Sequence, residues 1–445
     1  MLAAADSPDL DAGHAGLTPG AIADLRGCLG NLFLPSVSET AVLKSIPPTI
    51  TLAQALTTRW DAVVVGAGPA GAFAAVGLAR AGLTTLLVDR KAFPRHKVCG
   101  GCLNAHAVGL LEKAGLADEL RGLGARPLSA IQLRYGRRRA DLALPSGLAV
   151  TRATLDASMV RAAISAGSSF LPETSALVTA EDTLPDRRSD GTRRIALQQR
   201  DTRSAVACAR VVVVADGLGH SSLNDCPSMR GVVESDARIG VGAVASAGCV
   251  NSLGGCVTMV VGRGGYVGIT DVEEARINIA AAIDVEFLRA QGGPAGAVRA
   301  ILASAHIPAT SALETLDWQG TVPLTRHVVR PAAHRVFVLG DAAGYVEPFT
   351  GEGMAWALSA ADALVPLAAR AIAGWDSAIE QQWLDTYDRM VRRNQRWCRI
   401  IARTLRYPPL VGLMVASLSL QPALARPFLA RVAPGAPSVS IGGPR

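Results

Sequence analysis

The chain has 445 residues, enough for about three domains of roughly 150 residues each. Hydrophobic residues make up 49% and charged residues 18%, which supports a large buried core and excludes a disordered or fibrous protein. The net charge of +7 comes from the C-terminus, where residues 386–445 carry ten Arg and one acid. The sequence has no zinc-ligand spacing and no basic–aromatic run that would point to nucleic-acid binding.

The cysteine spacing, the N-terminal sequence and the longest apolar stretch together indicate the cellular compartment. Eight Cys at irregular spacing do not form a disulfide framework, so we expect a reducing compartment. Residues 1–20 lack the basic start and apolar segment of a targeting peptide. The longest apolar stretch, Pro408–Leu420, is shorter than the roughly 20 residues that a membrane span needs. We therefore expect a cytoplasmic protein.

The first ordered elements are expected to form a β-α-β unit. Residues 1–58 contain scattered Gly, Pro, Ser and Asp and no regular spacing of apolar residues. We therefore predict a disordered extension there. The apolar run Asp61–Val65 predicts a buried strand, Ala70–Ala81 a helix, and Leu83–Val88 the next strand. Together they span about 30 residues, as a β-α-β unit does.

Strands and helices alternate through the rest of the chain. Strands are predicted at 131–135, 140–144, 175–180, 194–198, 211–215 and 336–339, and helical regions at 154–167 and 353–405. The pair Asp190-Gly191 is a turn signal and predicts a hairpin between two of these strands. Residues 230–325 mix short strands with one predicted helix, Val285–Leu302, and indicate a separate antiparallel sheet layer.

The strongest motif is the glycine-rich segment Gly66-Ala-Gly68-Pro-Ala-Gly71, which follows a predicted strand and opens a predicted helix. Its first Gly permits a tight turn, its second lets the backbone approach a pyrophosphate, and its third lets helix and strand pack closely. Asp89, at the end of the next strand, is placed to accept hydrogen bonds from a ribose diol. This context predicts dinucleotide binding but does not distinguish NAD from FAD.

Later segments favour FAD. Asp341 follows a predicted strand directly, where its carboxylate can hold the ribityl chain of a flavin. The segment from Pro348 to Gly353 then leads into a helix, whose N-terminus would face the part of the flavin that becomes negative on reduction. Asp216-Gly217 completes a set of motifs found in one class of flavoproteins.

On these motifs the sequence resembles the FAD-dependent para-hydroxybenzoate-hydroxylase-like superfamily, and within it the geranylgeranyl reductase family with its halogenase and monooxygenase relatives. The most specific likeness is the segment Lys91–Gly101, whose PRxKxCGG core is similar to that of the reductases. Residues Val150–Asp156 also look like that family's step from strand to helix. The resemblance covers about residues 60–405.

The resemblance implies FAD, with Asp89 on the adenosine ribose, Asp341 on the ribityl chain, and a loop with Arg95, Lys97 and Cys99 beside the flavin. The full set of expected FAD-binding residues is Gly66, Gly68, Pro69, Ala70, Gly71, Asp89, Arg90, Arg95, Lys97, Cys99, Gly100, Arg152, Asp216, Gly217, Gly340, Asp341, Pro348, Gly351, Glu352, Gly353 and Met354.

The sequence departs from the resembled family at the substrate pocket. Geranylgeranyl reductases usually carry a YxWxFP-like segment there, whereas Gly265–Thr270 has neither Trp nor Pro, which leaves the isoprenoid substrate open. The WxWxIP segment of flavin halogenases is absent too, so we do not expect halogenation. Tyr266 and Cys99 are the candidate catalytic residues, for proton delivery or ring contact; packing within a sheet is the alternative for Tyr266.

Other candidate sites have weaker support. Cys99 and Cys102 have CxxC spacing, but a loop after a strand does not suit a redox pair, and no second pair completes a zinc site, so we expect no metal. Residues 240–245 match a second dinucleotide motif only loosely and lie in a strand-like run. NAD(P)H is therefore expected to bind transiently, unless a protein donor reduces the flavin. His96, His220 and His327 are expected on the surface or in loops.

The C-terminal helical region has an apolar stripe with Arg on its other faces. The stripe consists of Trp383, Tyr387, Met390, Trp397, Ile401 and Leu405. Two readings remain open: a helix packed on the FAD domain with a solvated basic face, or a peripheral contact with anionic lipid.

We predict an α/β fold: a Rossmann-like, glutathione-reductase-type FAD domain, an inserted antiparallel-sheet substrate domain and a helical C-terminus. The FAD domain is expected at 59–127, 151–228 and 326–375, the substrate domain at 128–150 and 229–325, and the helical region at 376–445. The predicted function is NAD(P)H-driven hydride transfer to a carbon–carbon double bond of an apolar, isoprenoid- or polyketide-like substrate. The alternatives are a monooxygenase acting through a C4a-hydroperoxyflavin and a non-catalytic flavin-binding protein. Oligomeric state stays open.

Overall fold

The computed structural model describes residues 44–179, 191–200, 202–250, 254–347, 349 and 351–427. It confirms the predicted α/β class. Its first sheet has the strand order β17-β18-β9-β1-β2-β6, in which every pair is parallel except β17 with β18. These strands are β1 (Arg59–Val65), β2 (Thr85–Val88), β6 (Ser169–Leu171), β9 (Ala205–Val214), β17 (Ala332–Ala333) and β18 (Val336–Val338).

A hairpin extends this sheet. Strands β7 (Thr174–Val178) and β8 (Arg193–Gln199) pair antiparallel, and β8 pairs with β9, as the turn signal predicted. Gly191 has the positive φ of 67° that a tight turn needs, while Asp190 lies outside the described residues.

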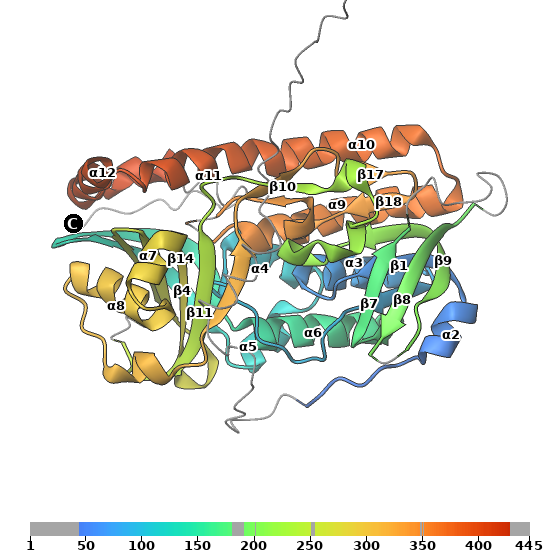
Figure 1. Cartoon of the computed structure of the whole chain (residues 1–445), viewed down its shortest axis with the longest axis horizontal. Helices are drawn as coiled ribbons and strands as arrows, with labels where there is room; N and C mark the ends of the chain where they lie inside the picture. Colours follow the sequence, from blue (N-terminus) through green and yellow to red (C-terminus); the bar gives the residue numbers. More distant parts are fainter. Residues whose placement is uncertain are drawn as a thin grey trace, which may run out of the picture.

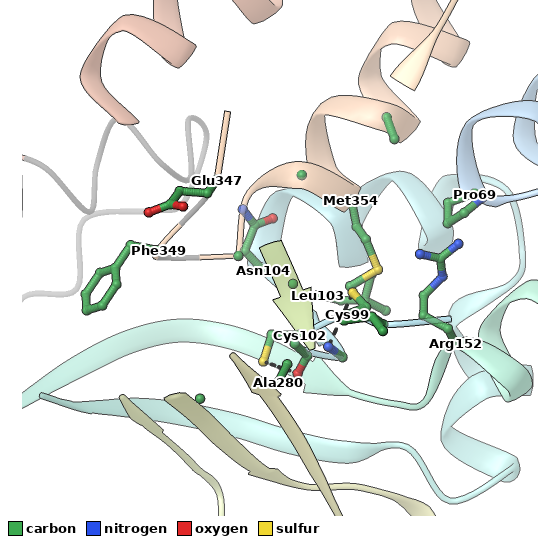
Figure 2. Close-up of a pocket in the computed structure, with 18 of the residues that line it drawn as sticks. Pro69, Cys99, Cys102, Leu103, Asn104, Arg152, Ala280, Glu347, Phe349 and Met354 are labelled. Atoms are coloured by element: carbon green, nitrogen blue, oxygen red, sulfur yellow. Dashed lines mark hydrogen bonds between the residues drawn. The ribbon is translucent and has the colours of Figure 1, made fainter. Parts of the chain in front are cut away.

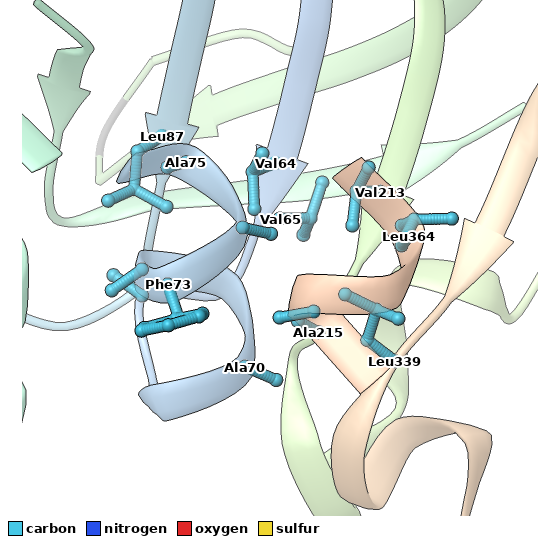
Figure 3. Close-up of a cluster of buried hydrophobic side chains, with 14 of the residues drawn as sticks. Val64, Val65, Ala70, Phe73, Ala75, Leu87, Val213, Ala215, Leu339 and Leu364 are labelled. Atoms are coloured by element: carbon cyan, nitrogen blue, oxygen red, sulfur yellow. The ribbon is translucent and has the colours of Figure 1, made fainter. Parts of the chain in front are cut away.

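The parallel sheet is buried on both faces, which explains its continuous Val-rich strands. Helix α3 (Pro69–Arg80) lies against it with a face of small residues. Figure 3 shows Ala75 of α3 beside Val64 of β1, and Leu364 of the long helix α9 (Gly353–Ala373) beside Val213 of β9. Helices α4 (Ala105–Lys113), α5 (Ala117–Gly122) and α6 (Arg152–Ser165) complete this half. Small side chains let the helices approach closely and hold the strand ends in place.

The second sheet has the order β15-β11-β14-β13-β12-β4-β5-β3 and is antiparallel except for β12 with β4. Its strands are β3 (Cys102–Leu103), β4 (Arg126–Tyr135), β5 (Arg138–Ala149), β11 (Ile239–Ser246), β12 (Cys256–Gly262), β13 (Gly265–Asp271), β14 (Arg276–Ile283) and β15 (Gln319–Pro323). The loose glycine motif at 240–245 thus lies inside a strand. A small sheet of β10 (Gly231–Val233), β16 (Arg326–Val328) and β19 (Gly344–Tyr345) accompanies the two large ones.

One face of the second sheet packs on two helices. The sequence predicted a single helix over 285–302, and that prediction was wrong: Gly292 and Gly293, both with positive φ, separate α7 (Val285–Ala290) from α8 (Pro294–Ser304). The pattern of apolar residues continues across the break because both short helices pack on one core.

The last helices run along one long side of the molecule, and α9 lies beneath them (Figure 1). They are α10 (Ser377–Tyr387), a π-helical turn over Asp388–Arg392, α11 (Arg393–Thr404) and α12 (Pro408–Leu420). Among the described residues α9 alone is long and apolar enough to cross a membrane, but more than half of it is buried inside the structure. Its length therefore reflects a core position.

The expected disorder of residues 1–58 was wrong for residues 44–58. There, Ile46 is buried and donates its backbone N–H to Phe93, and α2 (Leu52–Thr57) begins with a capping box made by Thr51 and Gln54. The indole of Trp60 donates to the Ala55 carbonyl at 2.8 Å. Tertiary contacts thus order a segment that has no helical period of its own.

Candidate active site

A cleft of about 230 Å³ lies between the two large sheets. Its lining comes from the carboxyl ends of β1, β9 and β18, from residues 97–105, from the starts of α6 and α9, and from the second sheet. In Figure 2, Pro69 and Arg152 lie at one end of the view and Glu347 and Phe349 at the other. We name these the Arg152 end and the Glu347 end.

The glycine-rich turn has the geometry that the sequence predicted. Gly66 has a φ of +99°, and a Cβ there would lie 2.4 Å from the Ala215 carbonyl oxygen. A Cβ on Gly71 would lie 1.8 Å from the Gly66 oxygen, so the backbone of α3 is in direct contact with the turn that follows β1. Gly68 precedes α3 without any side-chain cap and lines the cleft with Pro69 and Ala70, which leaves the first helical N–H groups available to an anion.

Two guanidinium groups stand beside this helix start. Arg152, buried at the start of α6, donates to both oxygens of Asp156 at 2.8 and 2.9 Å. Arg95 lies 3.5 Å from both Asp156 and Asp89. A Cβ on Gly68 would be 3.5 Å from Arg152 and 3.7 Å from Arg95. A helix N-terminus and two fixed cations fit a pyrophosphate.

Asp89 lies behind the turn. Its carboxylate accepts from the backbone N–H groups of Ala67 at 2.8 Å and Lys91 at 2.9 Å, and the residue is buried outside the cleft lining. A carboxylate has about four acceptor positions, so these bonds leave capacity for a ribose, and that role stays a prediction. Arg90 is exposed, with its guanidinium close to Gly219.

Asp341 and Lys97 face each other across the middle of the cleft, at 4.0 Å between Oδ2 and Nζ. Burial and then the charge of Arg152 lower the pKa of Lys97, while Asp341 opposes the change. Helix α9 begins at Gly353 without a side-chain cap, and Gly351, Gly353 and Met354 line the cleft. These free N–H groups fit the negative end of a reduced flavin.

Several predicted cofactor residues do not line the cleft. Glu352 is buried, and its Oε2 lies 4.0 Å from the Cys398 thiol. Asp216 accepts from the Ser222 N–H at 3.0 Å, whereas its neighbour Gly217 does line the cleft. Pro348 lies outside the described residues.

His220 lies in a loop, as expected, between two short 3-10 turns. It is buried there, with its Nε2 2.8 Å from the Met229 carbonyl oxygen. The structure places His96 in a half-buried position and leaves His327 exposed on β16.

Cys99 and Cys102 are both free thiols, and no described residues group as a metal site. Cys99 lines the cleft, and its carbonyl accepts from Asn278 at 2.8 Å. Cys102 donates to the Gly100 carbonyl at 3.2 Å and lies 3.6 Å from the Thr270 hydroxyl. Burial raises the pKa of Cys102 to about 12.

The Glu347 end is largely apolar. Tyr266 on β13 is buried and lines the cleft, with its ring edge-on to Phe349 at 5.0 Å between centroids. Burial and the nearby Glu347 raise the pKa of its hydroxyl well above 10, so it stays protonated. Tyr266 thus packs within the second sheet and also lines the cleft, so its position is compatible with both interpretations given above. The surrounding apolar wall consists of Leu128, Ile131, Leu144, Val257, Met259 and Leu324.

Sequence reasoning missed a buried polar network here. Arg238 donates to Glu347 at 2.9 Å and to Asp284 at 3.1 Å. A second missed residue, Glu273, accepts from the backbone N–H of Thr151 at 3.0 Å and so ties the start of α6 to the second sheet. No local motif marks these acids, because their partners are distant in sequence.

Comparison with known proteins identifies the cofactor domain. Residues 59–249 match the FAD binding domain family. The match covers less than half of the chain, and it confirms an FAD-binding domain with FAD as its cofactor.

Two curated relatives are reductases. The chain is 34% identical over 170 residues to the Menaquinone reductase of Mycolicibacterium smegmatis, which covers 36% of this chain and 38% of that protein. It is 28% identical to Digeranylgeranylglycerophospholipid reductase 2 of Methanopyrus kandleri over 78% of this chain and 85% of that protein. The match to the first relative thus spans well under half of its length.

A solved structure shares the fold across both halves. The geranylgeranyl bacteriochlorophyll reductase-like protein of Thermoplasma acidophilum superposes with a TM-score of 0.65 at 17% identity, over 84% of this chain and 98% of that one. At this identity the likeness concerns the fold alone.

Proposed function

We propose that this flavoprotein reduces a carbon–carbon double bond of an apolar, isoprenoid-type substrate, with NAD(P)H as the transient reductant. The observation that carries the proposal is one continuous cleft with a cationic, glycine-rich Arg152 end and an apolar Glu347 end. A flavin and an apolar ligand can share such a cleft. The two reductases that this chain resembles are named for menaquinone and for a digeranylgeranyl lipid, and this supports the same substrate class.

In this mechanism the protein binds and orients the cofactor and the substrate, and it excludes water from the site. Arg152 and Arg95 would hold the pyrophosphate at the start of α3, and Asp341 would hold the ribityl chain. The uncapped start of α9 would place backbone N–H groups where they favour negative charge. When bound, FAD would supply the hydride. The apolar wall around Met259 positions the substrate and keeps water from the reacting carbons.

The test is a pair of anaerobic half-reactions. NAD(P)H should bleach the bound flavin, and digeranylgeranylglycerophospholipid added afterwards should restore its colour while gaining two hydrogens by mass spectrometry. Menaquinone is the second probe, with product analysis to separate a saturated side chain from a reduced quinone ring. A flavin that NAD(P)H cannot reduce would point to a protein donor or to a non-catalytic flavoprotein.

A monooxygenase is the second candidate, favoured by the absence of Trp and Pro from Gly265–Thr270. Its signature is a transient C4a-peroxyflavin when the reduced protein meets oxygenated buffer with substrate bound, and a product that contains oxygen. Direct return to oxidised flavin together with a saturated product supports the reductase.

We also propose that the C-terminal helices dock on an anionic membrane. Large apolar side chains are exposed there, and we name them the C-terminal apolar surface: Trp397, Ile400, Tyr407, Leu410, Leu413, Leu420 and Leu424. Arg396 and Arg403 accompany Trp397 and Ile400 on α11 and make no ion pair within the described part of the chain. Apolar side chains flanked by Arg suit anionic lipid, at about 1 kcal/mol per basic residue.

The inner side of this surface reaches the cleft. Val411 and Val415 of α12 pack in the same hydrophobic cluster as Met259, Tyr266 and Phe349 of the cleft wall. A membrane contact at α12 would therefore bring a lipid substrate close to the Glu347 end.

Flotation with phosphatidylglycerol vesicles tests the docking. The wild type should float at low salt and be released at high salt, and Arg396→Glu with Arg403→Glu should abolish flotation. Val206→Ser, which removes an exposed apolar side chain from β9, is the matched control and should float normally. Flotation that persists at high salt, or no flotation at all, would contradict the proposal.

A further inference from the structure

Glu347 is a buried acid in the wall of the cleft, between β19 and α9 (Figure 2). The residue is 2% exposed. Its Oε1 accepts from Arg238 Nη1 at 2.9 Å, whereas its Oε2 is buried and has no hydrogen-bond partner among the described residues. A buried carboxylate oxygen without a donor is costly, by about 1–3 kcal/mol or more. A proton on Oε2, shared with a molecule in the cleft, removes that cost.

Arg238 does not belong to Glu347 alone. Its Nε donates to Asp284 at 3.1 Å, and Asp284 accepts in turn from Arg406 at 3.0 Å. Burial raises the pKa of Glu347, and Arg238 and Arg406 oppose that change only in part. Two phenols also lie close to Glu347: Tyr266, whose ring lies beneath Arg238, and Tyr345. Burial raises the pKa of both well above 10, so both are neutral. The network thus favours the protonated form of Glu347, and Arg238 stays close enough to stabilise the carboxylate once the proton has left.

We propose that Glu347 is the general acid of the cleft, holding a proton on Oε2 and donating it to one carbon of the substrate double bond. This inference rests on the proposed reductase function. The Oε2–H bond breaks, and a C–H bond forms with the π-electron pair of the substrate. The other carbon receives the hydride that bound reduced FAD supplies, so the product gains two hydrogens. The carboxylate is left paired with Arg238 and takes its next proton from solvent.

Geometry favours Glu347 over Cys102 and Tyr266 as the proton donor at this end of the cleft. The Cys102 thiol already donates a hydrogen bond to the Gly100 carbonyl, and its pKa of about 12 makes it a poor proton donor at neutral pH. Tyr266 packs edge-on to Phe349, and burial raises the pKa of its phenol well above 10, so it is also a poor donor at neutral pH. The free Oε2 is the acidic oxygen at this end that has no other role in the described structure.

The test compares Glu347→Gln with Tyr266→Phe and with the control Glu380→Gln, which changes an acid paired to Arg330 away from the cleft. All three should bind FAD and be reduced by NAD(P)H like the wild type. Reoxidation by digeranylgeranylglycerophospholipid should slow by about 10²- to 10⁴-fold in Glu347→Gln and by a few-fold at most in Tyr266→Phe.

An infrared measurement gives a readout independent of turnover. The oxidised wild type without substrate should show a protonated-carboxyl band near neutral pH that Glu347→Gln lacks and Glu380→Gln keeps. Reduction of the lipid at the wild-type rate by Glu347→Gln, loss of turnover in Tyr266→Phe instead, or absence of the band would each overturn the inference. An oxygenated wild-type product would instead overturn the reductase function itself, and with it the donor role.

Discussion

The two ends of the cleft are built on different principles. At the Arg152 end, backbone contacts fix the cofactor site: Gly66 and Gly71 bring helix and strand together at spacings too short for any side chain. At the Glu347 end, side chains from strands far apart in sequence, such as Leu128, Met259 and Leu324, form the wall. A backbone-defined site is visible in a short motif, whereas a side-chain-defined site is visible only once the sheet is assembled.

The same contrast predicts different tolerance to mutation. A Cβ at a backbone contact has no space to enter, so the helix itself must move. An apolar wall can exchange one apolar side chain for another of similar volume at a cost usually below about 1.5 kcal/mol. Mutations at the Arg152 end should therefore abolish cofactor binding, and mutations at the Glu347 end should change reactivity or substrate choice.

The largest expected effect is that of Gly71→Ala. The new Cβ would lie 1.8 Å from the Gly66 oxygen, which forces α3 away from the turn and misplaces its first N–H groups. We expect a loss of about 3 kcal/mol in the free energy of unfolding and no retained FAD. Urea denaturation and the flavin absorbance of the purified protein measure both.

Gly109→Ala is the matched control for this prediction. Gly109 lies inside α4, and a Cβ there would meet nothing within 4 Å. The substitution should leave FAD bound and stabilise the protein by about 0.5–1 kcal/mol. If both variants keep FAD equally, the close approach at Gly71 is not required for the site.

Physical reasons separate what the sequence predicted from what it did not. The strands β1 and β9 and the turn at Gly66 follow from local patterns, because a buried parallel strand and a phosphate turn each constrain a few consecutive residues. Arg152 was expected only from the family resemblance. The break at Gly292 was missed because the apolar period runs across it. Glu347 was missed because its importance depends on Arg238, which is distant in the chain.

The next effect concerns Asp341, which should hold the ribityl chain. Asp341→Ala should fold, because the carboxylate is partly exposed and its pairing with Lys97 at 4.0 Å is loose, yet it should purify without FAD. Asp341→Asn keeps one acceptor oxygen and should retain part of the flavin. Absorbance at the flavin band and thermal unfolding measure cofactor and fold separately. A fully yellow Asp341→Ala protein would refute the assignment.

The smallest effect is expected where the two ends meet, at Cys102. A Cβ on Gly351 would lie 3.6 Å from the Cys102 Cβ, and Thr270 of the second sheet lies on its other side. Because burial raises the pKa of this thiol to about 12, it is almost entirely protonated at pH 8 and should react with iodoacetamide about 10³-fold more slowly than a free cysteine.

The alkylation rate of Cys102 should rise about tenfold with each pH unit, since only the thiolate reacts, as long as the fold persists. Protein unfolded in urea, in which all eight cysteines are accessible, sets the reference rate. Cys102→Ser should keep FAD and turnover near the wild-type level, because the hydroxyl can still donate to the Gly100 carbonyl. Rapid labelling of Cys102 at pH 8, or loss of turnover in Cys102→Ser, would instead give this thiol a chemical role and place reactivity at the boundary between the two ends.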